Sequence, residues 1–207
     1  MALRRRVPEP ETRVLAWTPG ERSEKTRDRL LQGARLAFLN GGYEGTRIDD
    51  IAAAASVSRA TFYVYFPSKR DAFLALGVDS ERDAYQVLAA LRDVPSPPPD
   101  PADLSNWVGL YIAHFDRHGA FDRLWRQATA TDQALHDEGL RHELAFARRL
   151  GQQLDRLRGS KTGDPTLQGL CLSGMVEGVW LTSERSGVFT REVVIEALVA
   201  SLRGLLA

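Results

Sequence analysis

The sequence of 207 residues has few features of secreted or membrane proteins. It contains one cysteine, Cys171, so no disulfide can form within the chain and a disulfide-stapled secreted scaffold is excluded. No uninterrupted apolar run approaches the roughly 18 residues that span a bilayer. The start, MALRRRVPEPETRV, is basic, but Pro and Glu stand where a signal peptide has its apolar core. We therefore expect a cytoplasmic protein without a membrane partner.

The chain also lacks net charge, because 27 basic residues balance 27 acidic ones. This balance excludes a uniformly basic coat for nucleic acid, but the charge is unevenly distributed. Residues 1–70 carry 13 Lys and Arg against 8 Asp and Glu, whereas the remainder carries 14 against 19. A basic front end on an acidic body indicates a polyanionic partner at that end of the protein.

Strand-like alternation is absent as well, and the apolar spacing is helical throughout. A Pro-rich linker, PSPPPDP, stands at 95–101, and Gly119 is expected to break a helix. The fold class is therefore all-α, with about nine helices. They are expected near residues 24–40, 46–55, 59–65, 68–93, 101–118, 120–131, 132–158, 165–186 and 190 to the end.

Residues 46–69, TRIDDIAAAASVSRATFYVYFPSK, carry the most specific pattern. Two short helices joined by a turn of three to four residues form a helix-turn-helix, whose second helix enters the major groove of DNA. Apolar residues such as Ile51, Phe62 and Phe66 supply the inward face. The outward positions of the second helix hold hydrogen-bonding groups and rings without an acid, which suits phosphates and base edges: Ser58, Arg59, Thr61, Tyr63 and Tyr65.

This segment closely resembles the TetR family of bacterial transcriptional regulators. The matching positions are Thr46, Ile51, Ala52, Ala55, Val57, Ser58, Thr61, Tyr63, Tyr65, Phe66 and Lys69. The run TFYVYFPSK is most similar to the mycobacterial EthR-like branch. Ser56 departs from the family, which usually has Gly at this turn position, where a positive φ is expected. A residue other than Gly in that conformation costs about 1 kcal/mol.

The resemblance implies a role for each matching residue of the motif. Thr46, which is also expected to cap the second helix, and Arg47 would meet a phosphate. Arg59 and Thr61 would reach base edges, and Lys69 would clamp another phosphate. The predicted DNA-binding set is Thr46, Arg47, Ser58, Arg59, Thr61, Tyr63, Tyr65 and Lys69.

Two of these assignments, and a DNA-binding role of the N-terminal arm, have structural alternatives. Tyr65 can instead be half-buried core, and Lys69 with Arg70 can be surface charges in the first turn of a helix. The N-terminal Arg4, Arg5 and Arg6 can reach a minor groove or form a solvated tail.

The C-terminal half is rich in large rings, which in an isolated sequence usually form core. The resemblance implies instead a pocket between the middle helices for a hydrophobic or aromatic small molecule. The predicted lining residues are Trp107, Tyr111, His114, Phe115, Trp125, Phe146, Met175 and Trp180, with Gln127 as a further polar contact.

The helix expected at 165–186 is apolar nearly all round, so it must be covered on both sides. It is either a buried central helix of a monomer or, together with the last helix, a homodimer interface of the kind that the resemblance implies. The predicted interface residues are Gly174, Gly178, Val194, Leu198 and Leu202. A dimer also suits DNA, since two recognition helices meet half-sites separated by one helical turn or a multiple of it.

No cofactor, metal or catalytic residue is predicted. His114 and His118 stand four residues apart, but two ligands do not complete a metal site. Cys171 is expected to be a small buried hydrophobe. The resemblance favours a flexible basic arm (1–22), a helix-turn-helix DNA-binding domain (23–70) and a ligand-binding and dimerisation domain (71–207).

The functional hypothesis is a homodimeric repressor, associated with the nucleoid when bound, that leaves a palindromic double-stranded DNA operator when a hydrophobic effector binds. Two alternatives remain open: a helical small-molecule-binding enzyme with an accidental motif, and an architectural DNA-binding protein without an effector.

Overall fold

The computed structural model describes residues 20–95 and 97–206, so Arg4, Arg5 and Arg6 lie outside the described residues. Within these ranges the chain forms eight helices and no strand. The helices are α1 (Glu21–Gly45), α2 (Ile48–Ala54), α3 (Arg59–Tyr65), α4 (Lys69–Asp93), α5 (Pro101–Thr129), α6 (Gln133–Arg158), α7 (Pro165–Ser186) and α8 (Arg191–Leu206). The all-α prediction is confirmed.

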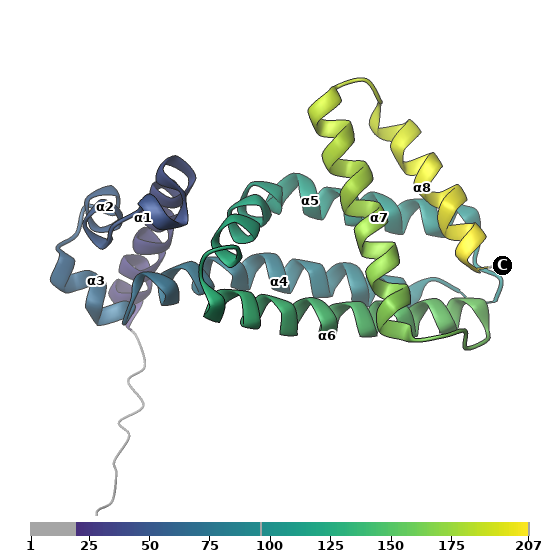
Figure 1. The fold of residues 1–207 in the computed structure, drawn as a ribbon, viewed down its shortest axis with the longest axis horizontal. Coiled ribbons are helices and arrows are strands. Elements are labelled where there is room, and N and C mark those ends of the chain that lie inside the picture. The colour runs from purple at the N-terminus through teal and green to yellow at the C-terminus, as the bar shows by residue number, and fades with distance from the viewer. Residues whose placement is uncertain (1–19, 96, 207) are drawn as a thin grey trace, which may run out of the picture.

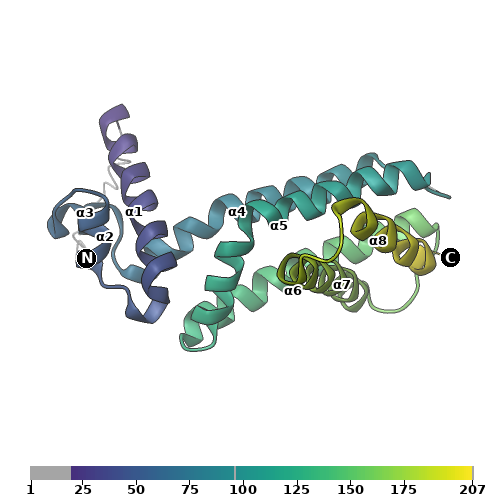
Figure 2. The same cartoon turned by 90° about the horizontal axis from the view of Figure 1, so that it is seen from above.

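The helices form a small head and a longer body (Figure 1). Helices α1, α2 and α3 make the head, and α4 leads from it into the body. In the body α4 lies between α5 and α6 in the view of Figure 1, and α7 and α8 cross one face of these helices (Figure 2). The end of α5 and the start of α6 return to the head, so that the two parts touch at this corner.

The predicted count of nine helices was wrong, because Gly119 does not break a helix. Helix α5 runs without interruption from Pro101 to Thr129. A Cβ atom at Gly119 would lie 2.1 Å from Cη2 of Trp180, closer than any real contact. Gly119 is therefore a packing glycine that makes room for the Trp180 ring of α7.

Several predicted helix ends are confirmed by their caps. Ser58 and Ser68 accept hydrogen bonds from the third residue after each of them, at the starts of α3 and α4. Asp164 caps α7, with Pro165 in the first turn, and Gly187 ends the helix in the left-handed conformation. The expected stop at Gly42 is an interruption within α1, where φ is 67° and ψ is 173°.

Two apolar cores hold the molecule together. The first joins the head to the base of the body, since Phe38, Ile51 and Phe62 share a cluster with Phe73 of α4 and Phe121 of α5. The second fills the far part of the body between α4, α5, α6, α7 and α8. In the part of the chain that the structure describes, none of the helices has the length and apolar character needed to cross a membrane.

Candidate functional site

The turn between α2 and α3 has the backbone geometry that its sequence position predicts. Ser56 adopts a φ of 53°, so the expectation of a left-handed residue at this point is confirmed. Nη2 of Arg29, on α1, donates to the carbonyl oxygens of Ala55 at 2.7 Å and Ser56 at 3.0 Å. These hydrogen bonds satisfy two turn carbonyls and hold the turn against α1.

The outward face of α3 combines charge, an aromatic ring and hydroxyl groups. Arg59 is exposed, and its guanidinium donates to Asp49 at 2.7 Å and to the Tyr63 hydroxyl at 3.3 Å. The hydrogen bond to Tyr63 and the charge of Asp49 raise the pKa of Arg59. Tyr63 is 45 % exposed, and Ser58 Oγ accepts from the N–H of Thr61. Arg59 and Tyr63 thus form one accessible polar patch on the helix that the motif assigns to the major groove.

Two exposed apolar residues of α3 were missed by the sequence interpretation, which considered only polar groups. Val64 is 71 % exposed, and Ala60, one turn earlier, is exposed on the same side. The helical spacing could have predicted their exposure. Phe62 and Phe66 point inward, so the residues two positions before each of them point outward. Apolar side chains at such places are suited to the methyl group of thymine.

The prediction for Thr46 was wrong. Its side chain is buried, and its Oγ1 lies 2.6 Å from the Gly42 carbonyl oxygen and 3.0 Å from that of Ala37. The cap of α2 is Arg47, whose backbone N–H donates to Asp50 at 2.8 Å. The Thr46 hydroxyl donates to backbone carbonyl oxygens near the interruption of α1, so its proton is not available to a phosphate.

Tyr65 and Lys69 are also engaged within the head. The Tyr65 hydroxyl lies 3.1 Å from Ser23 Oγ of α1, and the ring is partly buried, as the alternative interpretation expected. Nζ of Lys69 donates to the Tyr43 carbonyl oxygen at 2.7 Å and lies 4.5 Å from the centre of the Tyr43 ring. An ammonium group has three hydrogens, so Lys69 keeps donors for a phosphate.

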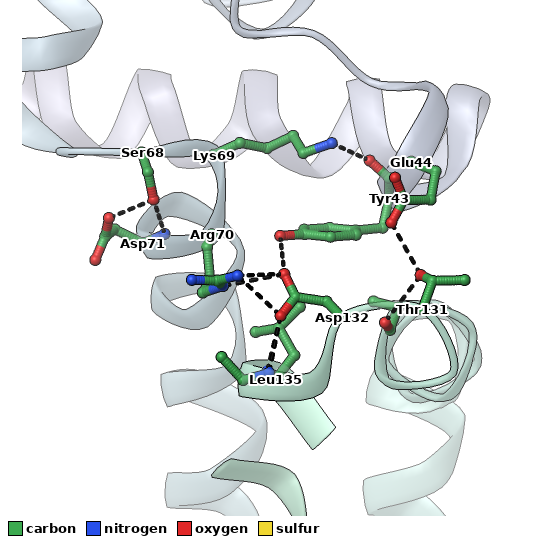
Figure 3. A network of polar contacts seen from close by, with 11 residues as sticks. Tyr43, Glu44, Ser68, Lys69, Arg70, Asp71, Thr131, Asp132 and Leu135 are labelled. Atoms are coloured by element: carbon green, nitrogen blue, oxygen red, sulfur yellow. Dashed lines mark hydrogen bonds and ion pairs between the residues drawn. The ribbon is translucent and has the colours of Figure 1, made fainter. Parts of the chain in front are cut away.

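A polar network joins the head to the body (Figure 3). Asp132 caps α6 and accepts from Arg70 Nε at 3.0 Å and Nη2 at 2.9 Å, while the Tyr43 hydroxyl donates to it at 3.1 Å. Burial opposes ionisation of Asp132, but the hydrogen bonds from Arg70 and the Leu135 N–H outweigh it and lower its pKa. Burial, followed by the bond to Asp132, raises the pKa of Tyr43 to about 12.

A cavity of about 650 Å³ lies between α4, α5, α6 and α7. Five of the predicted lining residues surround it: Tyr111, His114, Phe115, Trp125 and Phe146. Further lining residues that the sequence interpretation missed are Tyr85, Phe121, Asp122 and Glu177. Polar members of this group sit one or two helical turns from predicted rings, so helical spacing alone could have suggested them.

Three predicted lining residues lie elsewhere. Trp107 is 2 % exposed in the far core, where its Nε1 donates to the Val87 carbonyl oxygen at 2.9 Å. Trp180 stacks on Phe115 and donates to Asp116 at 2.9 Å. Met175 packs against the far core, and Gln127 is an exposed residue near Gly42. The aromatic residues predicted to line the pocket are therefore divided between the cavity wall and the apolar core of the body, because one face of a helix contributes to both.

Two lining residues have buried polar atoms without a partner in the described part of the chain, namely Oδ2 of Asp122 and Nδ1 of His114. Burial raises the pKa of Asp122 to about 6. Burial, followed by the charge of nearby His118, lowers the pKa of His114 to about 4. At neutral pH the wall of the cavity therefore holds a largely ionised carboxylate and a neutral imidazole.

The predicted dimer residues fall into two groups. Gly174 and Gly178 are exposed on α7, with no heavy atom within 4 Å of a Cβ built at either position. Val194, Leu198 and Leu202 of α8 were assigned wrongly, because they are 7 %, 2 % and 1 % exposed and pack into the chain's own core. The apolar stripe of α8 faces inward, and its open face carries Val193 and Leu205 instead. Cys171 is exposed on α7, contrary to the prediction of burial.

Two of the four histidines lie against carboxylates. Nε2 of His118 lies 3.0 Å from Asp83, and the His114 and His118 rings are 5.0 Å apart. His142 lies 2.7 Å from Glu81 and 2.9 Å from Glu138. Across residues 20–95 and 97–206 no three His, Cys, Asp or Glu side chains are grouped so as to hold a metal ion.

Comparison with known proteins finds similarity in the head. Residues 30–76 match the model of the bacterial regulatory proteins of the tetR family. The HTH-type transcriptional regulator EthR of Mycobacterium tuberculosis is 32 % identical over 109 residues, which cover 51 % of this chain and 46 % of that protein. The chain thus aligns with about half the length of this relative.

Two further comparisons extend into the body. The HTH-type transcriptional repressor AcnR of Corynebacterium glutamicum is 24 % identical over 135 residues, covering 61 % of this chain and 68 % of that protein. A solved structure of a transcriptional regulator of the TerR/AcrR family from Aquifex aeolicus has a TM-score of 0.70 at 15 % identity. It covers 87 % of this chain and 99 % of that one. At this identity the structural likeness shows a shared fold.

Proposed function

We propose that this chain is a ligand-responsive transcriptional repressor of the tetR family, because residues 30–76 match the model of the bacterial regulatory proteins of that family. In this proposal a homodimer binds a palindromic operator with its two heads, and a small molecule in the cavity releases it. The observation that carries the proposal is the accessible face of α3, which presents Arg59, Tyr63 and Val64 beside a helix-turn-helix turn with a left-handed residue.

The DNA-binding roles divide between bases and phosphates. Arg59 reaches a guanine, exchanging Asp49 for a base edge, and Val64 contacts a thymine methyl group. Ser58, Thr61 and Tyr63 hydrogen-bond to bases or backbone. Arg47, Tyr65 and Lys69 are assigned to phosphates, with Lys69 using the hydrogens that Tyr43 leaves free.

The dimer is proposed to form through the open faces of α7 and α8. Gly174 and Gly178 leave space for a second backbone, and Leu167, Val193 and Leu205 are 63 %, 50 % and 40 % exposed beside them. An apolar face of this kind is costly in water and is suited to a second copy of the chain. Two-fold symmetry then pairs each head with one half of the operator.

Coupling between cavity and head is proposed to pass through α4 and the start of α6. Trp125 of the cavity wall stacks on Phe73 with ring centres 5.6 Å apart. The ring centres of Phe73 and Tyr43 are 4.9 Å apart. Tyr43 and Arg70 both bind Asp132. A ligand that favours one arrangement of these helices shifts the spacing of the two heads, and DNA and ligand weaken each other by the same factor.

Selection of bound fragments from genomic DNA tests this function. A repressor enriches a few sites with inverted half-sites, and its affinity for them falls steeply with salt, with a slope well above one counterion. An architectural protein would enrich many unrelated sites, and a small-molecule enzyme would enrich none. Either of these results would refute the proposal.

A further inference from the structure

The cavity between α4, α5, α6 and α7 has an acidic wall. Among the described residues that line it are five carboxylates and one arginine: Glu81, Asp122, Glu138, Glu143, Glu177 and Arg126. Its volume of about 650 Å³ lies within the range of cavities that hold drug-sized ligands. The charge of this wall disfavours an anionic ligand.

Most of these carboxylates have partners or contact water. Glu177 pairs with Arg126, and both Glu81 and Glu138 bind His142. Glu143 is exposed on α6. Their charges are therefore balanced by the protein or by solvent.

Asp122 differs from the others because its Oδ2 is buried without a hydrogen-bond partner among the described residues. Burial raises its pKa to about 6, while His118, Arg126 and a hydrogen bond with Ser80 favour the ionised form and Glu177 opposes it. At neutral pH most molecules therefore carry a desolvated anion with an unused acceptor atom. Such a group is stabilised by a cation that donates a hydrogen bond.

Aromatic rings line the same cavity as this carboxylate. Phe121 and Trp125 flank Asp122 in sequence on α5, and Phe115 and Tyr111 lie about two and three turns before it on the same helix, stacked with ring centres 5.3 Å apart. Phe146 faces them from α6, 6.3 Å from Tyr111. Aromatic faces attract cations electrostatically and also bury apolar surface.

His114 supplies a second polar point on the same helix. Its Nδ1 is buried without a partner in the described part of the chain, and burial lowers its pKa to about 4, so it does not repel a cation at neutral pH. It precedes Asp122 by eight residues, which corresponds to about 12 Å along the axis of α5. A ligand that satisfies both atoms must therefore be elongated.

We propose that the effector of this protein is an elongated organic cation, whose protonated amine donates to Asp122 and whose apolar body lies among the rings in the direction of His114. This inference rests on the proposed function and specifies the chemical class of the ligand at that site. It replaces the neutral hydrophobic effector that the family resemblance suggested.

Matched probes of different charge test the inference by isothermal titration calorimetry on the full chain. The cationic probe is the diphenylmethyl ether of 2-(dimethylamino)ethanol, which is protonated at neutral pH. Its carbon isostere, diphenylmethyl 3-methylbutyl ether, has the same shape without the charge, and dodecanoate supplies an anion. We expect the amine to bind about tenfold or more tightly than its isostere, and dodecanoate to bind more weakly than the amine.

Two variants locate the charge that recognises the amine. Asp122→Asn keeps the size of the side chain and removes the charge, so the amine should lose about tenfold in affinity while the isostere is unaffected. Asp137→Asn removes an exposed carboxylate of α6 outside the cavity and should leave both affinities unchanged. Circular dichroism confirms that each variant is folded.

Equal affinity for amine and isostere, no binding of the amine at millimolar concentration, preferred binding of dodecanoate, or equal effects of the two variants would each overturn the inference. Its failure is separate from that of the proposed function. The selection of operator sites uses the ligand-free protein, so a repressor with a neutral or anionic effector would still enrich inverted half-sites.

Discussion

Arg70 and Asp132 form a bidentate ion pair that ties the first turn of α4 to the N-terminus of α6. Arg70 lies next to the helix-turn-helix, and Asp132 follows the segment of α5 that carries Trp125 and Thr129 of the cavity wall. The pair is therefore placed where a change in the cavity can reach the head. Its contribution can be separated from that of an ordinary surface pair.

A double-mutant cycle of Arg70→Met and Asp132→Asn should give a coupling energy of about 1–2 kcal/mol in urea unfolding, because the pair is bidentate and Asp132 is largely buried. The exposed Arg82–Asp79 pair is the control, and its cycle should give at most about 0.5 kcal/mol. Arg70→Met should also reduce the factor by which the amine probe weakens operator binding. Equal coupling energies for the two pairs would contradict this role.

Ser56→Gly should stabilise the protein by about 0.5–1 kcal/mol, because glycine adopts the φ of 53° without the steric cost that serine incurs. Chemical denaturation measures the change. Ser160→Gly, at an exposed position without positive φ, should leave stability unchanged or lower it. A loss of stability in Ser56→Gly would mean that the serine side chain compensates for the strain.

Tyr63→Ala should weaken operator binding about tenfold or more while leaving the fold intact, since this side chain is 45 % exposed on α3. Thr46→Val should do the reverse: it should lower stability by about 1 kcal/mol through the lost hydrogen bonds and leave the operator affinity of the folded protein unchanged. Fluorescence anisotropy with the selected operator and thermal unfolding distinguish the two effects. Wild-type affinity in Tyr63→Ala would refute the assigned contact surface.

Asp122→Asn should make the protein more stable at pH 7.5 by about 2 kcal/mol and have little effect near pH 4. The folded pKa of about 6 lies above the unfolded value, so the penalty for ionising Asp122 is absent below the unfolded pKa and grows as pH rises through 6. His114 titrates in the wild-type protein and in the variant alike, so its contribution cancels in the difference between their free energies of unfolding. Denaturation of both proteins across this pH range measures the effect, and a difference independent of pH would contradict it.

Gly178→Glu should yield a folded monomer, because the position is open and a charge there would oppose the proposed dimer face. Leu198→Glu should instead unfold the body, since this side chain is 2 % exposed in the far core. Analytical ultracentrifugation and circular dichroism separate the two outcomes. A Gly178→Glu protein that remains dimeric would place the interface elsewhere.

The sequence by itself determined what depends on neighbours along the chain. Helical spacing, the caps at Ser58, Ser68 and Asp164, and the left-handed turn at Ser56 are set by local backbone geometry, so they could be predicted. The helix-turn-helix motif is compact in sequence for the same reason, and so is the similarity of residues 30–76 to the tetR family model.

The tertiary structure decided every question that depends on what a side chain meets across space. Gly119 suggests a break in the sequence, yet it makes room for Trp180 more than sixty residues later. An apolar stripe looks the same whether it faces a cavity, the protein's own core or a second copy, as Trp107, Tyr111 and Leu198 demonstrate. The Oδ2 atom of Asp122 that lacks a hydrogen-bond partner among the described residues could not be foreseen, because this lack is a property of the packed neighbours and not of the residue.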